Sequence, residues 1–278
     1  MTEEGHGGHW QCIFEDLSEF VRLLPTVVEH GRFIDKPPGS PLEVGASAGI
    51  IWPETPLCAL ALISGVPARA GVQQELRSAF PYAIRGARHR LLIEDVIPWR
   101  ESMAEAWVTA SLSNGDGPLL TFFETRFYAD KWHLSLRTEQ EFILAGIAHS
   151  AEVVSPQPIF ITELEAIRAM RAGTAHEGDS SPIEVHMDGA ALLFPRDDLG
   201  PEDYEFQGPV KEVEVFEAFG RKITRLTLTV VRLLDADEAD SDIDVELFVS
   251  DHAWRSEQRP KPGVDVRGLM WLQGRLAP

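Results

Sequence analysis

Two stretches of the sequence resemble each other, and this internal similarity constrains the fold more than any other feature. Residues 41–53 read PLEVGASAGIIWP, and residues 182–195 read PIEVHMDGAALLFP. Both begin with proline, an aliphatic residue, glutamate and valine, pass through small residues, and end with aliphatics, an aromatic and proline. Because an internal repeat is the signature of a repeated supersecondary unit, the similarity predicts a duplicated chain.

Further matches keep a nearly constant spacing. Tyr82–Gly86 matches Tyr204–Gly208 at a separation of 122 positions, and Phe127–Asp130 matches Phe248–Asp251 at 121. The prolines that open the two stretches are instead 141 positions apart, which predicts an insertion in the first copy around residues 57–76. The alternative is that two β-rich segments share alternation and turn residues without a common origin.

The second strong pattern is alternation of apolar and polar residues, which is typical of half-buried strands. It appears at residues 106–112, which a turn at 114–118 joins to a second strand at 119–128. It returns at 213–215, 223–234 and 243–249, and residues 263–276 are largely apolar. These patterns predict a mainly β protein with a few helices (α+β), built from two tandem, duplicated small antiparallel β domains that are barrel- or OB-like.

Helical spacing is confined to a few segments. Residues 13–29 are spaced as an amphipathic helix, residues 70–79 as a short one, and Thr162–Glu165 forms a capping box for a helix that ends at Gly173. Residues 57–63 predict a buried strand, and residues 1–11 a mobile terminus. Residues 139–151 follow a possible capping box, but the duplication favours a strand there, so both assignments stay open.

These segments suggest four parts. Residues 1–35 are an N-terminal tail and amphipathic helix, and residues 36–154 a first β domain with a helical insertion. Residues 155–181 are a helix and linker, and residues 182–278 a second β domain.

Charge limits the choice of partner. The net charge of −19, from 25 basic and 44 acidic residues, argues against nucleic acid, because each phosphate contact normally needs a cation. No apolar run is long enough to span a membrane, and no secretion signal is recognisable at the N-terminus. Two cysteines are too few for a disulfide framework, so we expect a cytoplasmic protein.

The acidic run from Asp235 to Glu246 is the most distinctive surface feature. It lacks the glycine and the fifth-position acid of a calcium-binding EF-hand loop, so we interpret it as a solvated loop leading into an acidic strand. Asp242, Asp244 and Glu246 would form the outer face of that strand and are the predicted binding residues. His6, His9 and Cys12 have metal-ligand spacing, but they lie at the terminus without a fourth ligand, so we expect neither a metal nor a cofactor.

Two carboxylate–histidine pairs occupy equivalent places in the proposed copies. Asp130 with His133, and Asp251 with His252, carry the residue types needed for general acid–base catalysis. The favoured explanation is structural, with the aspartate starting a turn after a strand and the neighbouring tryptophan capping the core, and it requires no chemistry. The sequence contains no nucleophile elbow and no phosphate-binding glycine loop.

From these patterns we expect a non-catalytic binding or interaction protein whose acidic surface engages a basic protein partner. The alternative is a hydrolase-like enzyme that uses Asp130, His133, Asp251 and His252 in a cleft between the two β domains. A third possibility is an assembly role for the N-terminal helix. The oligomeric state is not indicated by the sequence.

Overall fold

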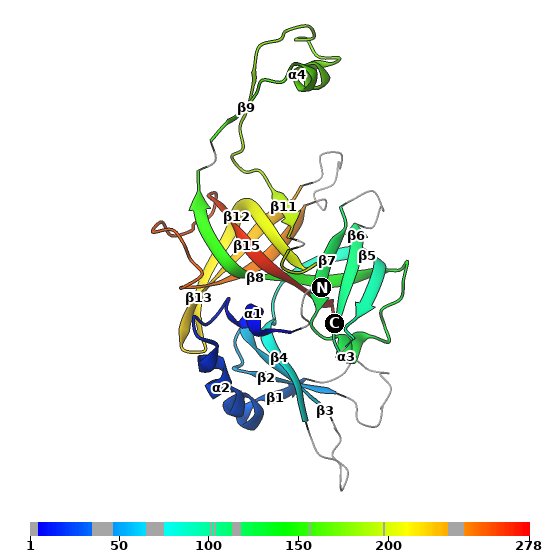
Figure 1. Ribbon diagram of the computed structural model, residues 1–278, viewed down its shortest axis with the longest axis vertical. Helices are drawn as coiled ribbons and strands as arrows, with labels where there is room; N and C mark the ends of the chain where they lie inside the picture. Colours follow the sequence, from blue (N-terminus) through cyan, green and yellow to red (C-terminus); the bar gives the residue numbers. More distant parts are fainter. Residues whose placement is uncertain are drawn as a thin grey trace.

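The computed structural model describes residues 5–34, 47–64, 75–100, 102, 104–112, 118–155, 157–196, 198–232 and 242–278. Among them are fifteen strands and four helices, so the predicted mainly β class is confirmed. Figure 1 shows a body of curved sheets, a layer of helices and strands below it, and an arm that projects from the opposite end.

A nine-stranded sheet forms the body. Its order is β11-β12-β13-β14-β8-β15-β7-β6-β5. The strands are β5 (Ala87–Pro98), β6 (Ala106–Leu112), β7 (Leu120–Glu124), β8 (Glu139–Val154), β11 (Leu192–Pro195), β12 (Asp203–Ala218), β13 (Arg221–Val231), β14 (Ile243–Ser250) and β15 (Asp265–Leu276). A short helix, α3 (Phe127–Asp130), lies between β7 and β8.

Two further pairings, β8 with β5 and β12 with β15, close the hydrogen-bonding pattern into two circuits. One circuit is β5-β6-β7-β15-β8, and the other is β12-β13-β14-β8-β15. All pairings in them are antiparallel except β14 with β8 and β15 with β7, which are parallel. Strands β8 and β15 belong to both circuits, so segments from the two halves of the chain share one sheet.

Side-chain alternation along the shared strands separates two hydrophobic cores. On β8, Leu144 and Ala148 face one core, whereas Ala145 and Ile147 face the other. Because successive side chains of a strand point to opposite faces, both faces of the shared strands are buried. Close packing here depends on Gly268 of β15, where an added Cβ would lie 2.0 Å from the Ser150 carbonyl oxygen of β8.

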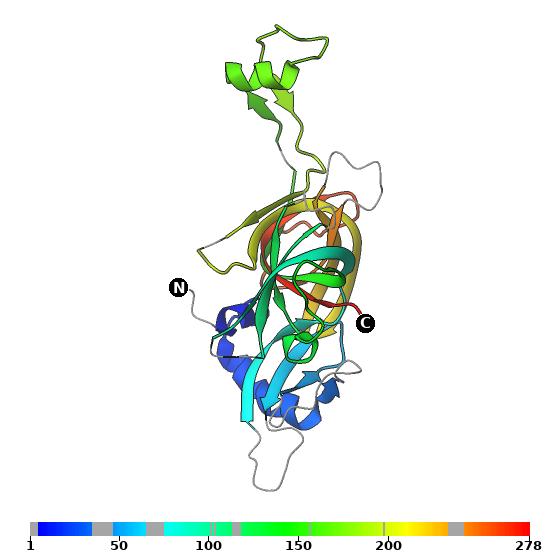
Figure 2. The ribbon, with the colours of Figure 1, turned by 90° about the vertical axis from the view of Figure 1, so that its right-hand side faces the viewer.

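A second, four-stranded sheet lies below the body with the order β1-β2-β3-β4. Its strands are β1 (Arg32–Ile34), β2 (Ala48–Trp52), β3 (Leu57–Ser64) and β4 (Glu75–Ala83). Helices α1 (Gly7–Trp10) and α2 (Leu17–His30) cover this sheet (Figures 1 and 2). The Asp16 side chain caps α2 by accepting a hydrogen bond of 2.8 Å from the Ser18 amide.

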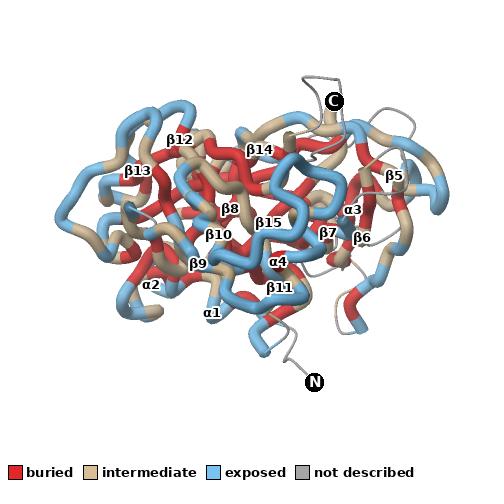
Figure 3. Tube along the Cα trace, turned by 90° about the horizontal axis from the view of Figure 1, so that it is seen from above, coloured by how far each residue is buried: buried red, intermediate tan, exposed pale blue. Residues whose placement is uncertain are grey.

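The arm comprises β9 (Ile159–Ile161), α4 (Leu164–Arg171) and β10 (Ile183–Val185). Strands β9 and β10 form a two-stranded sheet of their own, separate from the sheets of the body. Figures 1 and 2 show the arm extending well away from the body, and Figure 3 shows it as largely exposed.

Several sequence predictions are confirmed. Residues 57–63 form the buried strand β3, and residues 223–231, 243–249 and 265–276 lie in strands. The amphipathic helix predicted at 13–29 is α2, which begins at Leu17. Residues 139–151 are strand, since they lie within β8, so the repeat was the better guide there than the capping box.

Others are wrong. The helix predicted at 70–79 is wrong over 75–79, which belongs to β4, because pairing with β3 overrides the local spacing. The strand predicted at 119–128 ends at Glu124, and α3 follows it. Thr162 does not cap α4, whose N-cap is Glu163 without a side-chain hydrogen bond.

The mobile terminus predicted at 1–11 is wrong for the residues described. Trp10 is buried, stacks on Phe20 at a ring-centroid distance of 3.7 Å, and donates a hydrogen bond of 2.9 Å from its indole nitrogen to the Ala79 carbonyl. These contacts fix the segment against β4 and α2. Within the described parts of the chain, no helix has the length and apolar character needed to cross a membrane.

Candidate functional site

The predicted acidic residues lie at the start of β14. Ile243, Val245 and Leu247 are buried, while Asp244 and Glu246 point to the other face of the strand, as the alternation predicted. Asp242 directly precedes the strand. The three carboxylates therefore do share one side of the sheet.

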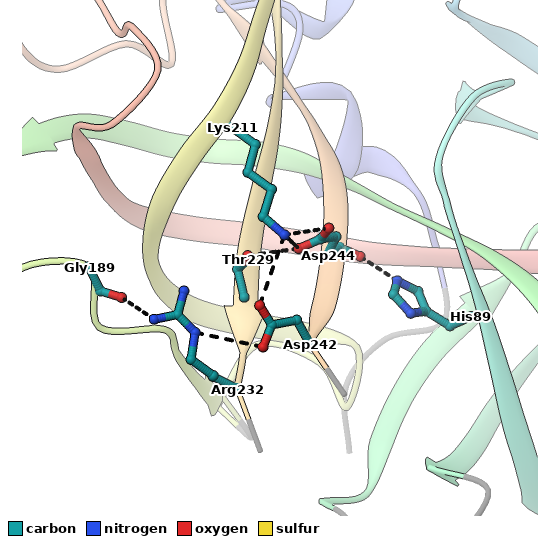
Figure 4. Close-up of polar contacts among 7 residues, drawn as sticks. All are labelled: His89, Gly189, Lys211, Thr229, Arg232, Asp242 and Asp244. Carbon is teal, nitrogen blue, oxygen red and sulfur yellow. Dashed lines mark hydrogen bonds and ion pairs between the residues drawn. The ribbon is translucent and has the colours of Figure 1, made fainter. Parts of the chain in front are cut away.

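Cations from neighbouring strands neutralise this face (Figure 4). The Lys211 ammonium donates to both carboxylate oxygens of Asp244 at 2.7 and 2.8 Å, and lies 4.0 Å from Asp242. Arg232 lies 3.7 Å from the other oxygen of Asp242, and the Thr229 hydroxyl donates to Asp244 at 2.8 Å. The face is thus an array of alternating charges.

Glu246 is paired in the same way. The buried guanidinium of Arg225 lies 2.9 Å from Glu246 and 2.5 Å from Glu214 of β12, and Arg85 lies 3.9 Å from both carboxylates. The strand pattern alone did not reveal these cations, because they come from other strands and a loop.

His89 of β5 closes the edge of this face. Its Nε2 lies 2.8 Å from the backbone carbonyl oxygen of Asp244, so the ring N–H donates a hydrogen bond that joins β5 of one circuit to β14 of the other (Figure 4). Burial lowers the pKa of His89, although the hydrogen bond to Asp244 opposes this. His89 is therefore neutral near pH 7 and adds no cation to the array.

The two carboxylate–histidine pairs lie in different surroundings. Asp130 is buried at the end of α3, where burial raises the pKa of its carboxyl, while Arg126, at 3.9 Å, and the nearby His133 lower it. Asp251 is exposed and lies 3.7 Å from Arg259. No hydrogen bond or ion pair among the described residues joins one pair to the other.

His252 holds the N-terminal segment in place. Its Nδ1 lies 2.9 Å from the Ser250 hydroxyl, and its Nε2 lies 2.7 Å from the Gln11 carbonyl oxygen. The Ser250 hydroxyl in turn donates to the Cys12 carbonyl oxygen at 2.6 Å. In the described structure, the side chain of His252 therefore contacts the segment that carries Cys12.

Cys12 belongs to an array that the sequence did not suggest. Its sulfur lies 3.2 Å from Nδ1 of His149 on β8, and Nε2 of His149 lies 2.9 Å from an Asp203 carboxylate oxygen on β12. Burial lowers the pKa of His149, but its bonds to Asp203 and Cys12 outweigh this and raise the pKa to about 10. His149 is thus an imidazolium that donates one N–H to Asp203 and the other to the sulfur.

A thiol next to an imidazole that is itself held by a carboxylate is the arrangement used in nucleophilic catalysis. The sulfur itself is fully buried, as is Cys12 as a whole. Cys58, the second free cysteine, is also buried, and burial raises the pKa of its thiol well above the usual value. The two cysteines thus differ in the partner beside them.

The histidines of the N-terminal segment serve the packing of that segment. His6 Nε2 lies 2.6 Å from a Glu105 carboxylate oxygen, which also accepts a hydrogen bond of 2.8 Å from the Ser78 hydroxyl. Burial raises the pKa of Glu105, but the hydrogen bonds, led by that of His6, outweigh it and hold the pKa below the usual value. A hollow of about 420 Å³ lies beside this pair.

His9 stacks on Trp271 at a ring-centroid distance of 3.8 Å, and burial lowers its pKa well below the usual value. Within the described ranges, no group of three or more His, Cys, Asp or Glu side chains has the arrangement of a metal site. The calcium-loop hypothesis concerns residues 235–246, and its first part, to residue 241, lies outside the described residues.

Comparisons with known proteins do not add a family. No family model matches the chain, and no curated protein or solved structure matches it.

Sequence reasoning missed the array because its members lie 137 and 54 positions apart and in three different elements. The only signal was the proposed repeat, which predicted a strand for the segment of His149. The arm was interpreted as a helix and linker, and its projection could not be anticipated.

Proposed function

We propose that the protein is a non-catalytic binding protein that engages a protein partner through its arm. The observation that carries this proposal is that the arm has almost no core of its own. Of the residues in β9, α4 and β10, only Ile167 is buried. Four large apolar side chains of the arm are exposed by more than half: Ile159, Phe160, Leu164 and Met170.

Free energy explains why such an arm implies a partner. Fixing one residue costs about 1–2 kcal/mol of backbone entropy, whereas fully burying one large aliphatic side chain contributes about 1.5–3 kcal/mol. A helix as short as α4 is also marginal in isolation. An ordered arm therefore needs apolar surface from another molecule, and exposed apolar patches mark such interaction sites.

The charge favours a basic partner. The whole chain carries −19, and residues 157–190 contain six acidic and two basic residues. We include Asp242, Asp244 and Glu246 as a second contact, reached when a cationic partner displaces Lys211 and Arg232. Electrostatic steering by the acidic surface would speed the encounter.

Paired surface variants test the arm. We expect Phe160→Ser to weaken capture of a partner from cells that make the protein, because it removes an apolar side chain that is 58% exposed. Trp132→Ser, which removes an aromatic side chain 52% exposed on the body, is the matched control. Equal capture by wild type and both variants would overturn the role of the arm.

A cationic probe tests the acidic strand separately. Titration of an oligolysine peptide should show tighter binding to Lys211→Met than to wild type, because Asp244 loses its internal cation. The triple variant of Asp242, Asp244 and Glu246 to the corresponding amides should bind more weakly. If none of these substitutions changes the affinity for oligolysine, the acidic strand is not a second contact.

We also propose that the chain arose by duplication and that each half contributes to a barrel- or OB-like unit. The support is that β5-β6-β7 and β12-β13-β14 are equivalent meanders and that β8 and β15 play reciprocal roles. Each circuit contains one parallel pairing, β7 with β15 in the first and β14 with β8 in the second. On this proposal, β3 lies in the insertion of the first copy.

A second function is favoured by the Cys12–His149–Asp203 array. In a hydrolase-like thiol enzyme, the Cys12 thiolate would attack a substrate carbonyl carbon, and the bond to the leaving group would break as the His149 imidazolium passes it a proton. Water would then hydrolyse the thioester, releasing the acid and returning the proton to His149. Asp203 would orient the imidazole. This array takes the place of the candidates Asp130, His133, Asp251 and His252, because its members contact one another. Catalysis would require the N-terminal segment to open, because Cys12 is buried.

Alkylation with iodoacetamide, followed by mass spectrometry, tests this alternative within one chain. An enzyme requires Cys12 to react in the native protein much faster than Cys58, and to slow in Asp203→Asn. If both cysteines react only on unfolding, the array is structural.

Two unpaired thiols also support our proposal of a cytoplasmic location.

A further inference from the structure

A shallow groove of about 550 Å³ crosses the outer face of the body where β11, β12, β15 and the end of β8 lie side by side. Its walls combine apolar, cationic and acidic side chains. The apolar ones are Ala151, Leu192, Phe194, Phe206 and Leu269, the cationic ones are Arg196, Arg255 and Arg267, and the acidic ones are Glu152 and Glu205. Phe194 is 56% exposed, so a large apolar surface here has no cover from its own chain.

The arginines differ in how far they are already neutralised. Arg196 is paired with Asp198 and Glu205, and Arg267 lies 2.7 Å from Glu152. Arg255 is exposed and makes no ion pair with any residue that the structure describes. Judged by the described residues, the groove therefore offers one cation without an ion pair, Arg255, beside apolar side chains.

The arm has the complementary character. It carries the exposed Phe160 and Leu164, and a net charge of −4 over residues 157–190. Four of its carboxylates make no ion pair within the described residues: Glu163, Glu165, Glu177 and Asp188. The arm is thus apolar and acidic, whereas the groove is apolar and basic. The two surfaces therefore have the complementary character that interfaces require.

Position favours docking between two chains. Ser150 and Glu152 of β8 line the groove, and β8 ends at Val154, just before the arm begins. The arm extends away from the body in both views (Figures 1 and 2), and among the described residues no hydrogen bond or ion pair joins it to the groove lining. The groove and the base of the arm lie next to each other. A two-fold axis beside them would therefore let each of two chains place its arm on the other chain, in a closed, isologous contact.

We propose that the partner of the arm is a second copy of this chain, and that each arm docks in the groove of the other copy. The inference rests on the proposed binding function and names its partner. Docking covers Phe160 and Leu164 of the arm and Phe194 of the groove, and it brings the acidic arm to Arg255. The cationic contact is then local, at Arg255 of the groove, because the second copy as a whole also carries a net charge of −19.

Light scattering during size-exclusion chromatography of the full chain tests this proposal. We expect a mass of twice 30.9 kDa that falls toward 30.9 kDa on dilution. Arg255→Glu should raise the dissociation constant about ten-fold, the effect of losing one favourable charge contact. Arg259→Glu, a matched reversal outside the groove lining, should leave the dissociation constant unchanged.

The triple variant Glu163→Lys, Glu165→Lys and Glu177→Lys should weaken the dimer as Arg255→Glu does, and combining the two should restore it. A monomer at every concentration, a dimer that persists after replacement of residues 158–186 by a short linker, or failure of the combination to restore it would each overturn the self-docking. A monomer that still captures another protein in a Phe160-dependent manner would leave the binding function intact and refute only the choice of partner.

Discussion

The pair formed by His149 and Asp203 gives the sharpest prediction, because it ties a buried charge to a measurable dependence on pH. Replacement of Asp203 by Asn keeps the shape of the side chain and removes the charge that holds the imidazolium. The rise in the pKa of His149 from 6.5 to about 10 corresponds to roughly 5 kcal/mol, at about 1.4 kcal/mol per pH unit. The His149 side chain is 23% exposed, so we expect a loss of about 3 kcal/mol at pH 7.

The sign of the pH dependence follows from the proton count. Between about pH 6.5 and pH 10, native His149 keeps a proton that the unfolded chain releases, so the pair stabilises the fold fully below this window and not above it. The free energy of unfolding of wild type should therefore fall by about 2 kcal/mol between roughly pH 7.5 and pH 9. This component should be much smaller in Asp203→Asn, where only Cys12 still favours the imidazolium, whereas the titration of other groups is common to both proteins.

Urea unfolding followed by tryptophan fluorescence at these two pH values measures both quantities. Asp251→Asn is the matched control, because its carboxylate is 53% exposed and pairs with Arg259 at 3.7 Å. It should change the free energy of unfolding by less than about 1 kcal/mol and keep the pH slope of wild type. If Asp203→Asn also keeps that slope, His149 is not an imidazolium held by Asp203.

Two further predictions concern the body. Burial raises the pKa of Glu202 to about 7, so native Glu202 holds a proton that the unfolded chain loses above pH 4.5, and stability falls as pH rises from 4.5 through 7. Glu202→Gln should remove this fall and be more stable than wild type at pH 8 by about 2 kcal/mol in urea unfolding; equal stability at pH 8 would contradict it. Gly268→Ala should cost at least about 2 kcal/mol, or prevent folding, because its Cβ would lie 2.0 Å from the Ser150 carbonyl oxygen, and thermal unfolding measures this. Gly8→Ala, with no atom within 4 Å of the new Cβ, is the control, and equal melting temperatures for the two would contradict the close approach of β8 and β15.

The sequence predicted local structure where a single strand or helix determines it. Alternation identified β14 because one of its faces is buried, and a continuous apolar run identified β3 because both of its faces are buried. Periodicity identified α2 because its apolar side packs on the lower sheet. It failed at β4, where residues 75–79 have helical spacing but belong to a strand that pairs with β3 instead. Pairing with a distant strand is a property of the fold, which a short window does not contain.

The candidate sites show the same limit. The outward direction of Asp244 and Glu246 followed from alternation, but their neutralisation by Lys211 and Arg225 depends on which strands lie beside β14. The array around His149 depends on β8, β12 and the turn that carries Cys12, which are far apart in the sequence and meet only in the folded chain. The N-terminal segment looked mobile because it is rich in glycine, yet Trp10 fixes it in the core.

Hydrogen exchange of the arm at two protein concentrations tests the central claim most directly. If the arm docks on a partner copy, the amides of residues 164–171 should be protected in concentrated protein and should exchange faster on dilution. Amides of β8 should stay protected in both samples and serve as the internal reference. Exchange of the arm at the rate of an unstructured chain at both concentrations would contradict the claim that it folds against another molecule.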